Sequence, residues 1–370
     1  MLCSGQSAIA QNSYIDSMTQ WVETHPKIDS QHILTLHRIS FRYSEKNINK
    51  AFEYYEKVSN LSDSLNYDYG KALAQINLGL LLFTSANYNA SNSAYFRAIE
   101  YAETSDAKRL KAVSLNNIGE NFRALNEFDK CREYTRKAVL LNKELNVPRG
   151  VATNYELLQQ CDLKEHLYND AKKNLLEGMS YALKSNDSYI LSLYYIGFGK
   201  YCAINNQKDS ANYYFDKAME EASLQNDVRN KYRTYIAKAE FLKMIPSNEK
   251  LELLKSAYKL ARQTGYMEGI GYSAELISSY YDQNKNKDSS AQYFHIYRSA
   301  YDSIFSENNK RNVVIKETDW MINRKELENK HLQDLSLIQK RDLVFKNILL
   351  LASFILLLSG IVTAFFIYKN

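Results

Sequence analysis

Residues 76–102 read "INLGLLLFTSANYNASNSAYFRAIEYA", two runs of apolar and small residues on either side of a short polar stretch. Both runs repeat at a spacing of three or four residues, which is typical of one face of a helix. The recurring residues are Leu78, Gly79 and Leu82 in the first run and Tyr88, Ser91, Tyr95 and Ala98 in the second. Because small side chains let two helix backbones approach each other closely, the stretch predicts an antiparallel helix hairpin.

The same pattern returns every forty residues. The small residue midway along the second helix recurs as Ala51, Ser91, Cys131, Ala171 and Ala211, and twelve positions before each stands Ile39, Gly79, Gly119, Gln159 or Gly199. Two further copies, at 249–261 and 287–297, follow with a slip of about one residue. The period predicts an all-α fold, a superhelical array of about seven hairpins over residues 11–305, because hairpins of this kind bury their apolar faces only by stacking.

The pattern resembles the tetratricopeptide repeat (TPR), in which a Leu-Gly pair is followed by an aromatic residue and then by alanines. The second stretch that carries the resemblance is "NNIGENFRALNEFDKCREYTRKA", with Ile118, Gly119, Phe122, Phe128, Cys131 and Ala138 at the matching positions. The usual unit has about 34 residues, so the six extra residues imply longer helices or longer connections. The resemblance implies a superhelix whose first helices line a concave surface.

Repeat arithmetic predicts which side chains face that surface. The first two repeats offer an apolar lining of Ile33, Leu36, Leu73, Ile76, Leu80 and Phe83. The middle repeats offer Asn116, Glu120, Arg123, Glu156 and Gln160, and the later ones Lys200, Arg233, Glu240, Lys243, Tyr272 and Glu275. A surface graded from apolar to mixed charge suits a peptide or protein ligand. The alternative is that these are solvated helix faces without a ligand.

The sequence holds no motif of an enzyme, a cofactor site or a metal site. There is no phosphate-binding glycine loop and no nucleophile elbow, and the six histidines make no metal-ligand spacing. Lysine and arginine are scattered among the acidic residues and the net charge is only +5, which does not indicate nucleic acid. We expect all four cysteines, Cys3, Cys131, Cys161 and Cys202, to be small buried residues, and a disulfide between two of them stays open.

The last part of the chain changes character. Residues 306–346 are charged and lack glycine and proline, which predicts a helical stalk. A spacing of seven residues separates the apolar residues Val313, Trp320 and Leu327 in this segment. This is a weak coiled-coil seam, which would allow a homodimer. Residues 348–368 carry no charge, which predicts one transmembrane helix.

The order of repeats, stalk and span resembles the sensory half of bacterial membrane-bound histidine kinases and helix-turn-helix regulators. This implies a non-enzymatic, single-pass membrane protein that binds a peptide or protein with extracytoplasmic (periplasmic) repeats and takes part in signal transduction. Residues 1–10 are interpreted as the remnant of a signal peptide, because Ala8 and Ala10 have the spacing of a cleavage site. The basic residues before the span favour the opposite, cytosolic orientation. Two alternatives are a tail-anchored cytosolic scaffold and a truncated kinase or transcription regulator.

Overall fold

The computed structural model describes residues 4–44, 47–224, 227–241, 248–304, 334–351 and 353, with side chains from residue 14 onward. The chain divides into two compact units, residues 1–311 and 312–370. All regular secondary structure in the described residues is helical, which confirms the predicted all-α class.

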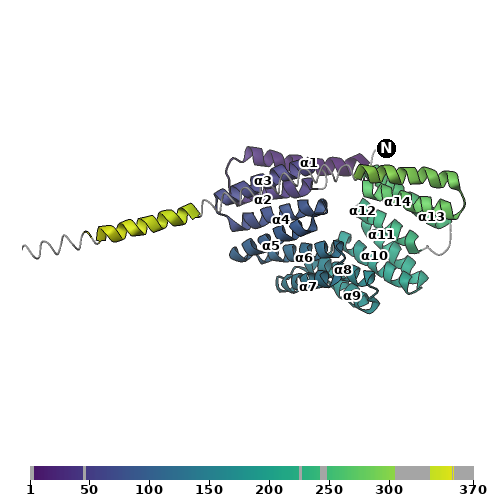
Figure 1. The fold of residues 1–370 in the computed structure, drawn as a ribbon. Helices are drawn as coiled ribbons and strands as arrows, with labels where there is room; N and C mark the ends of the chain where they lie inside the picture. Colours follow the sequence, from purple (N-terminus) through teal and green to yellow (C-terminus); the bar gives the residue numbers. More distant parts are fainter. Residues whose placement is uncertain are drawn as a thin grey trace, which may run out of the picture. The chain divides into compact units, whose positions relative to one another are not determined.

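The first unit is a series of helix hairpins (Figure 1). A preceding helix, α1 (Ser4–Thr24), packs on the first hairpin. The first helices of successive hairpins are α2 (Ser30–Tyr43), α4 (Asp68–Thr84), α6 (Lys108–Ala124), α8 (Pro148–Lys164), α10 (Ser188–Ile204), α12 (Val228–Phe241) and α14 (Met267–Gln283). The second helices are α3 (Ile48–Ser64), α5 (Tyr88–Thr104), α7 (Phe128–Glu144), α9 (Tyr168–Ser185), α11 (Lys208–Leu224), α13 (Asn248–Thr264) and residues 287–304. The predicted array of about seven hairpins is confirmed.

The forty-residue period comes from long helices and short connections. Helices α3 to α8 each have 17 residues, and three residues separate each from the next. The middle residue of each of these connections has a positive φ, as at Asn66, Ala86 and Asp106. This left-handed residue ends the helix, and the amide of the following residue then donates a hydrogen bond to a carbonyl oxygen in the last turn of that helix. The Asn87 amide, for example, donates to the Leu82 carbonyl oxygen at 2.9 Å. The six residues beyond a usual TPR unit therefore lie in the helices.

Within each hairpin the predicted small residues lie where the two helices cross. Ala51, Ser91, Cys131, Ala171 and Ala211 are all fully buried. The Ser91 hydroxyl donates a hydrogen bond to the carbonyl oxygen of Gly79 at 2.7 Å, so the two backbones are in near contact. A Cβ on Gly79 would lie 2.6 Å from the Tyr95 ring, which explains why a glycine stands there.

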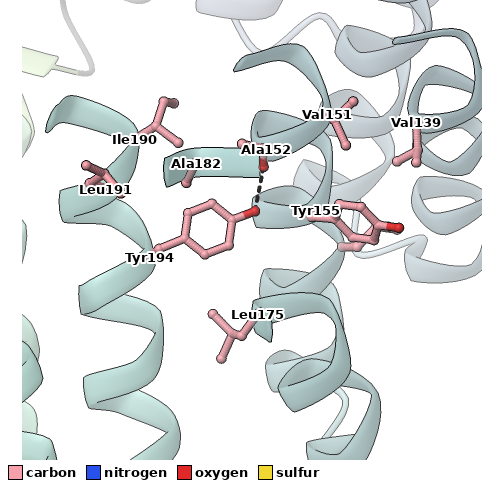
Figure 2. Packing of buried hydrophobic residues seen from close by; sticks show 10 residues of the cluster. Val139, Val151, Ala152, Tyr155, Leu175, Ala182, Ile190, Leu191 and Tyr194 are labelled. Carbon is pink, nitrogen blue, oxygen red and sulfur yellow. Dashed lines mark hydrogen bonds between the residues drawn. The ribbon is translucent and has the colours of Figure 1, made fainter. Parts of the chain in front are cut away.

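Successive hairpins are joined by large buried side chains. Tyr194 of α10 is fully buried, and its hydroxyl donates to the carbonyl oxygen of Ala152 in α8 at 2.7 Å (Figure 2). Leu175 and Ile190 belong to the same buried cluster. A buried tyrosine needs a partner for its hydroxyl, and here that partner lies in the preceding repeat.

The segment 1–10 interpreted as a signal-peptide remnant enters α1, and that interpretation stays a prediction. In the second unit, residues 334–351 are helical with exposed side chains such as Leu343 and Phe345. Most of the predicted stalk, 306–346, lies outside the described residues, as does its coiled-coil seam, and pairing of two copies along it stays a prediction.

The predicted membrane localisation is corrected. None of the helices in the described parts of the chain combines the length and the apolar composition needed to cross a bilayer. The predicted span 348–368 lies outside the described residues except for 348–351 and 353. The prediction of a single-pass membrane protein, in either orientation, is therefore withdrawn.

Candidate functional site: a hollow on the inner helices

A hollow of about 1380 Å³ lies along the first helices of four successive hairpins. Its lining comes from α6, α8, α10 and α12, with Glu249 at the start of α13 and Asn206 and Lys208 next to the end of α10. The second helices α7, α9 and α11 contribute only Lys208. The first helices thus form the concave layer that the TPR resemblance implies.

Eight of the seventeen residues predicted to face the concave surface line this hollow. They are Asn116, Glu120, Arg123, Glu156, Gln160, Lys200, Arg233 and Glu240. Leu80 and Phe83 are half-buried and do not line it; the Phe83 ring packs on Tyr88 with centroids 5.6 Å apart. Lys243 lies outside the described residues. The repeat register thus brings the middle candidates together, and their role in binding stays a proposal.

The prediction that the first two repeats give the concave surface an apolar lining is wrong for four residues. Ile33, Leu36, Leu73 and Ile76 are buried, with exposed fractions of 0%, 2%, 2% and 6%. Leu73 and Ile76 pack in one cluster with Tyr95. At the position equivalent to Leu73 three units later Leu193 lines the hollow, so the packing of the neighbouring helices, and not the apolar side chain alone, buries this position in the first two units.

Sequence reasoning missed several residues of the hollow. Leu157, Leu193 and Ile196 form part of an apolar floor between the charged side chains. Arg149 lines one end and forms an ion pair with Asp187, Nε to carboxylate oxygen 2.7 Å. Leu193 and Ile196 stand at the same repeat positions as the chosen residues and could have been found by the same arithmetic.

Most charged groups in the hollow have partners. The Arg123 guanidinium donates to Glu120, Nε to Oε2 3.0 Å, and these bonds raise the pKa of Arg123 above its ordinary value. The Tyr272 hydroxyl donates to the Glu240 carboxylate at 2.6 Å. Arg233 makes only long contacts, 3.3 Å to the Asn230 side-chain oxygen and 3.5 Å to the Tyr189 hydroxyl.

Lys200 is exposed in the hollow, and its ammonium makes no hydrogen bond or ion pair with any of the described residues. The same is true of Lys164 and Lys208, which also belong to the lining. Burial by the walls of the hollow lowers the pKa of Lys200, because water around the charged form is displaced, and the carboxylates of Glu240 and Glu156 act in the opposite direction. Burial likewise raises the pKa of Glu156, whose carboxylate accepts a hydrogen bond from the Gln160 amide.

The lining carries more positive than negative charge. The cations are Arg123, Arg149, Lys164, Lys200, Lys208 and Arg233, against the carboxylates of Glu120, Glu156, Glu240 and Glu249. With its apolar floor, this arrangement can hold an extended chain that carries an anionic group. Across the described residues no group of three or more metal-ligating side chains is gathered.

Stacked hairpins with a concave inner layer define the chain as a TPR-like helical repeat protein. No family model matches it, and no curated protein matches its sequence. Among solved structures it is similar to a Rap protein complexed with competence and sporulation factor, with 12% sequence identity and a TM-score of 0.61 over 79% of this chain and 81% of that one.

Two further solved structures are similar. One is the apo form of RapI, with 16% identity and a TM-score of 0.59 over 74% of this chain and 99% of that one. The other is the Rap conjugation gene regulator of the plasmid pLS20 in complex with the Phr* peptide, with 16% identity and a TM-score of 0.57 over 75% and 76% of the two chains. At these identities the likeness establishes the fold alone.

Proposed function

We propose that this protein binds a peptide, or an extended segment of a protein, in the hollow on α6, α8, α10 and α12, without catalysing a reaction. Lys200 receives an anionic group of the ligand, either an acidic side chain or a terminal carboxylate, and Arg233 is the second cation beside it. Apolar side chains of the ligand lie on the floor made by Leu157, Leu193 and Ile196.

The observation that carries this proposal is the unpaired Lys200 ammonium. The walls of the hollow displace part of the water around the Lys200 ammonium, which its lowered pKa reflects, while the side chain stays exposed to an incoming ligand. A carboxylate from a ligand would supply a charge-assisted hydrogen bond worth about 1.5–3 kcal/mol. Support also comes from the similar structure that holds the Phr* peptide, because it has the same kind of fold.

The resemblance of the repeats to the sensory halves of bacterial regulators extends the proposal to signalling. In this extension, ligand binding in the hollow changes how the protein interacts with a regulatory partner. The change of state would be carried by the packing between successive repeats, since every first helix of the hollow also contacts its neighbours.

A peptide library tests the binding proposal. Phage-displayed peptides of about twelve residues are selected on the purified protein, and enriched sequences are synthesised and measured by fluorescence anisotropy. We expect enrichment of acidic sequences, and a loss of about ten- to a hundredfold in affinity in Lys200→Met. The matched control is Lys173→Met, which makes the same change on an exposed lysine of the outer helix α9.

The result that would overturn the proposal is equally specific. It fails if no peptide is enriched above a control protein, or if the enriched peptides bind Lys200→Met and the wild type equally well. In either case the hollow is a solvated surface.

A further inference from the structure

Two cysteines face each other at the contact between the third and fourth forty-residue units. The sulfurs of Cys131 in α7 and Cys161 in α8 lie 2.8 Å apart, and both residues are fully buried. This is shorter than the distance of about 3.5–4.0 Å at which non-bonded heavy atoms rest. The third described cysteine, Cys202, is buried in a different cluster with Ala211 and Phe215.

The repeat explains why these two positions meet. Forty residues earlier the equivalent pair is Ser91 and Asn121, and the Asn121 side-chain amide donates to the Ser91 hydroxyl at 2.9 Å. The equivalent pairs elsewhere are Ala51 and Leu81, Ala171 and Tyr201, and Ala211 and Phe241. The two positions also meet as Ala211 and Phe241, which pack in one cluster, and of these five pairs Cys131–Cys161 has a thiol at both positions.

The surroundings favour a thiolate on one side. The pKa of Cys131 is lowered, first by the hydrogen bond from the Cys161 thiol and then by the Thr135 hydroxyl 3.9 Å away and the positive charge of Arg123, whereas burial and the Glu120 carboxylate act in the opposite direction. The same bond and burial raise the pKa of Cys161. A second cation, Arg132, lies in the same contact and pairs with Asp162 of α8 and with Glu165, the residue after α8. The thiolate is the form that attacks a disulfide.

We propose that Cys131 and Cys161 are a modification site at which a disulfide links α7 to α8. The oxidant is a small-molecule or protein disulfide. The Cys131 thiolate attacks one sulfur of that disulfide and releases the first thiolate. The Cys161 thiolate then attacks the Cys131 sulfur of the mixed disulfide and releases the second. The two cysteines lose two protons and two electrons, and the oxidant takes them up as two thiols.

Because both side chains are buried, the first attack takes place while the α7–α8 contact is open or still folding, when the bond from Cys161 is absent and the Thr135 hydroxyl of the same helix is the partner that stays beside Cys131. Once formed, the bond closes a loop of about thirty residues and prevents the two units from separating. Leu157, which lines the hollow, packs on both cysteines. The bond therefore fixes the spacing of two units directly behind the floor of the hollow.

The experiment measures thiols and thermal stability in the full chain. Protein incubated with oxidised glutathione is alkylated, digested without reductant and analysed by mass spectrometry, and its melting is compared with that of the reduced form. The control is the double variant Cys131→Ser with Cys161→Asn, which reproduces the hydrogen-bonded pair Ser91–Asn121. A second variant, Cys202→Ala, removes the other described thiol.

We expect a crosslinked peptide pair containing residues 131 and 161 in the wild type and in Cys202→Ala, with melting raised by about 5 °C. The double variant should melt at one temperature with or without reductant. The proposal is overturned if the two thiols stay free in oxidised glutathione, if Cys202 is crosslinked instead, or if the crosslink forms and melting does not change.

Discussion

A double-mutant cycle at the contact between α8, α9 and α10 tests how the array is held together. The Tyr194 hydroxyl occupies the space beside Gly178 of α9, and a methyl at 178 would meet that hydroxyl and lie 2.5 Å from the Tyr194 Cζ and 2.7 Å from the Tyr155 Cβ. Gly178→Ala should therefore be destabilising, although alanine favours a helix by about 1 kcal/mol. With overpacking of about 3 kcal/mol, the net loss is about 2 kcal/mol.

Removing the hydroxyl has a smaller effect. Tyr194→Phe loses one buried hydrogen bond, but the Ala152 carbonyl oxygen lies inside α8 and keeps its backbone partner. We expect a loss of about 1–1.5 kcal/mol. In the double variant the methyl at 178 no longer meets the hydroxyl, although the ring Cζ and the Tyr155 Cβ remain close to it. The overpacking is relieved in part, so the total loss should be about 1 kcal/mol smaller than the two single losses together.

The assay is urea unfolding of the four proteins, followed by circular dichroism at 222 nm. Tyr213→Phe is the control, because Tyr213 lies on α11 and is 57% exposed, and it should change the stability by less than about 0.5 kcal/mol. If the effects of the two substitutions simply add within about 0.5 kcal/mol, Tyr194 and Gly178 do not share one space and the packing argument is refuted.

Two further predictions concern the connections and the first hairpin. Ala86 has φ +57°, and Ala86→Gly should raise the free energy of unfolding by about 1 kcal/mol in urea, whereas Asn126→Gly in the equivalent connection should change it less; equal gains would contradict the reasoning. Burial lowers the pKa of His37 from 6.5 to about 4. Because the fold favours the neutral imidazole, the contribution of His37 to the free energy of unfolding is complete above pH 6.5. This contribution, up to about 3 kcal/mol, is lost as the pH falls towards 4. His37→Gln should flatten this part of the stability curve, and an unchanged slope would speak against it.

The hairpins could be predicted because their signal is repeated. A single Gly79 or Ser91 says little, but a small residue every forty positions states which face of each helix approaches its neighbour. The same arithmetic placed Glu120, Glu156 and Lys200 along one hollow, since equivalent positions in stacked units face the same way.

The other features of the fold and of the hollow depend on contacts between helices, which the forty-residue period does not predict. Leu73 and Leu193 stand at equivalent positions three units apart, yet Leu73 is buried and Leu193 lines the hollow, because the neighbouring helices decide between the two environments. The left-handed residues of the connections are only partly visible in the sequence: asparagine at 66 and 126 indicates them, whereas Ala86 and His166 adopt the same conformation without the usual residue type. The meeting of Cys131 and Cys161 was hidden for a similar reason, since the two positions are thirty residues apart and on different helices.

The central claim, that the hollow is the binding surface, is tested most directly by photo-crosslinking. A photoreactive benzophenone amino acid is placed at Leu193, which lines the hollow on α10, or at the exposed Tyr213 on the outer helix α11. Each protein is then irradiated with a library-selected peptide. We predict a crosslinked product from position 193 that disappears in Lys200→Met, and none from position 213. Crosslinking at 213 with none at 193 would show that the ligand binds the outer layer and would contradict the account.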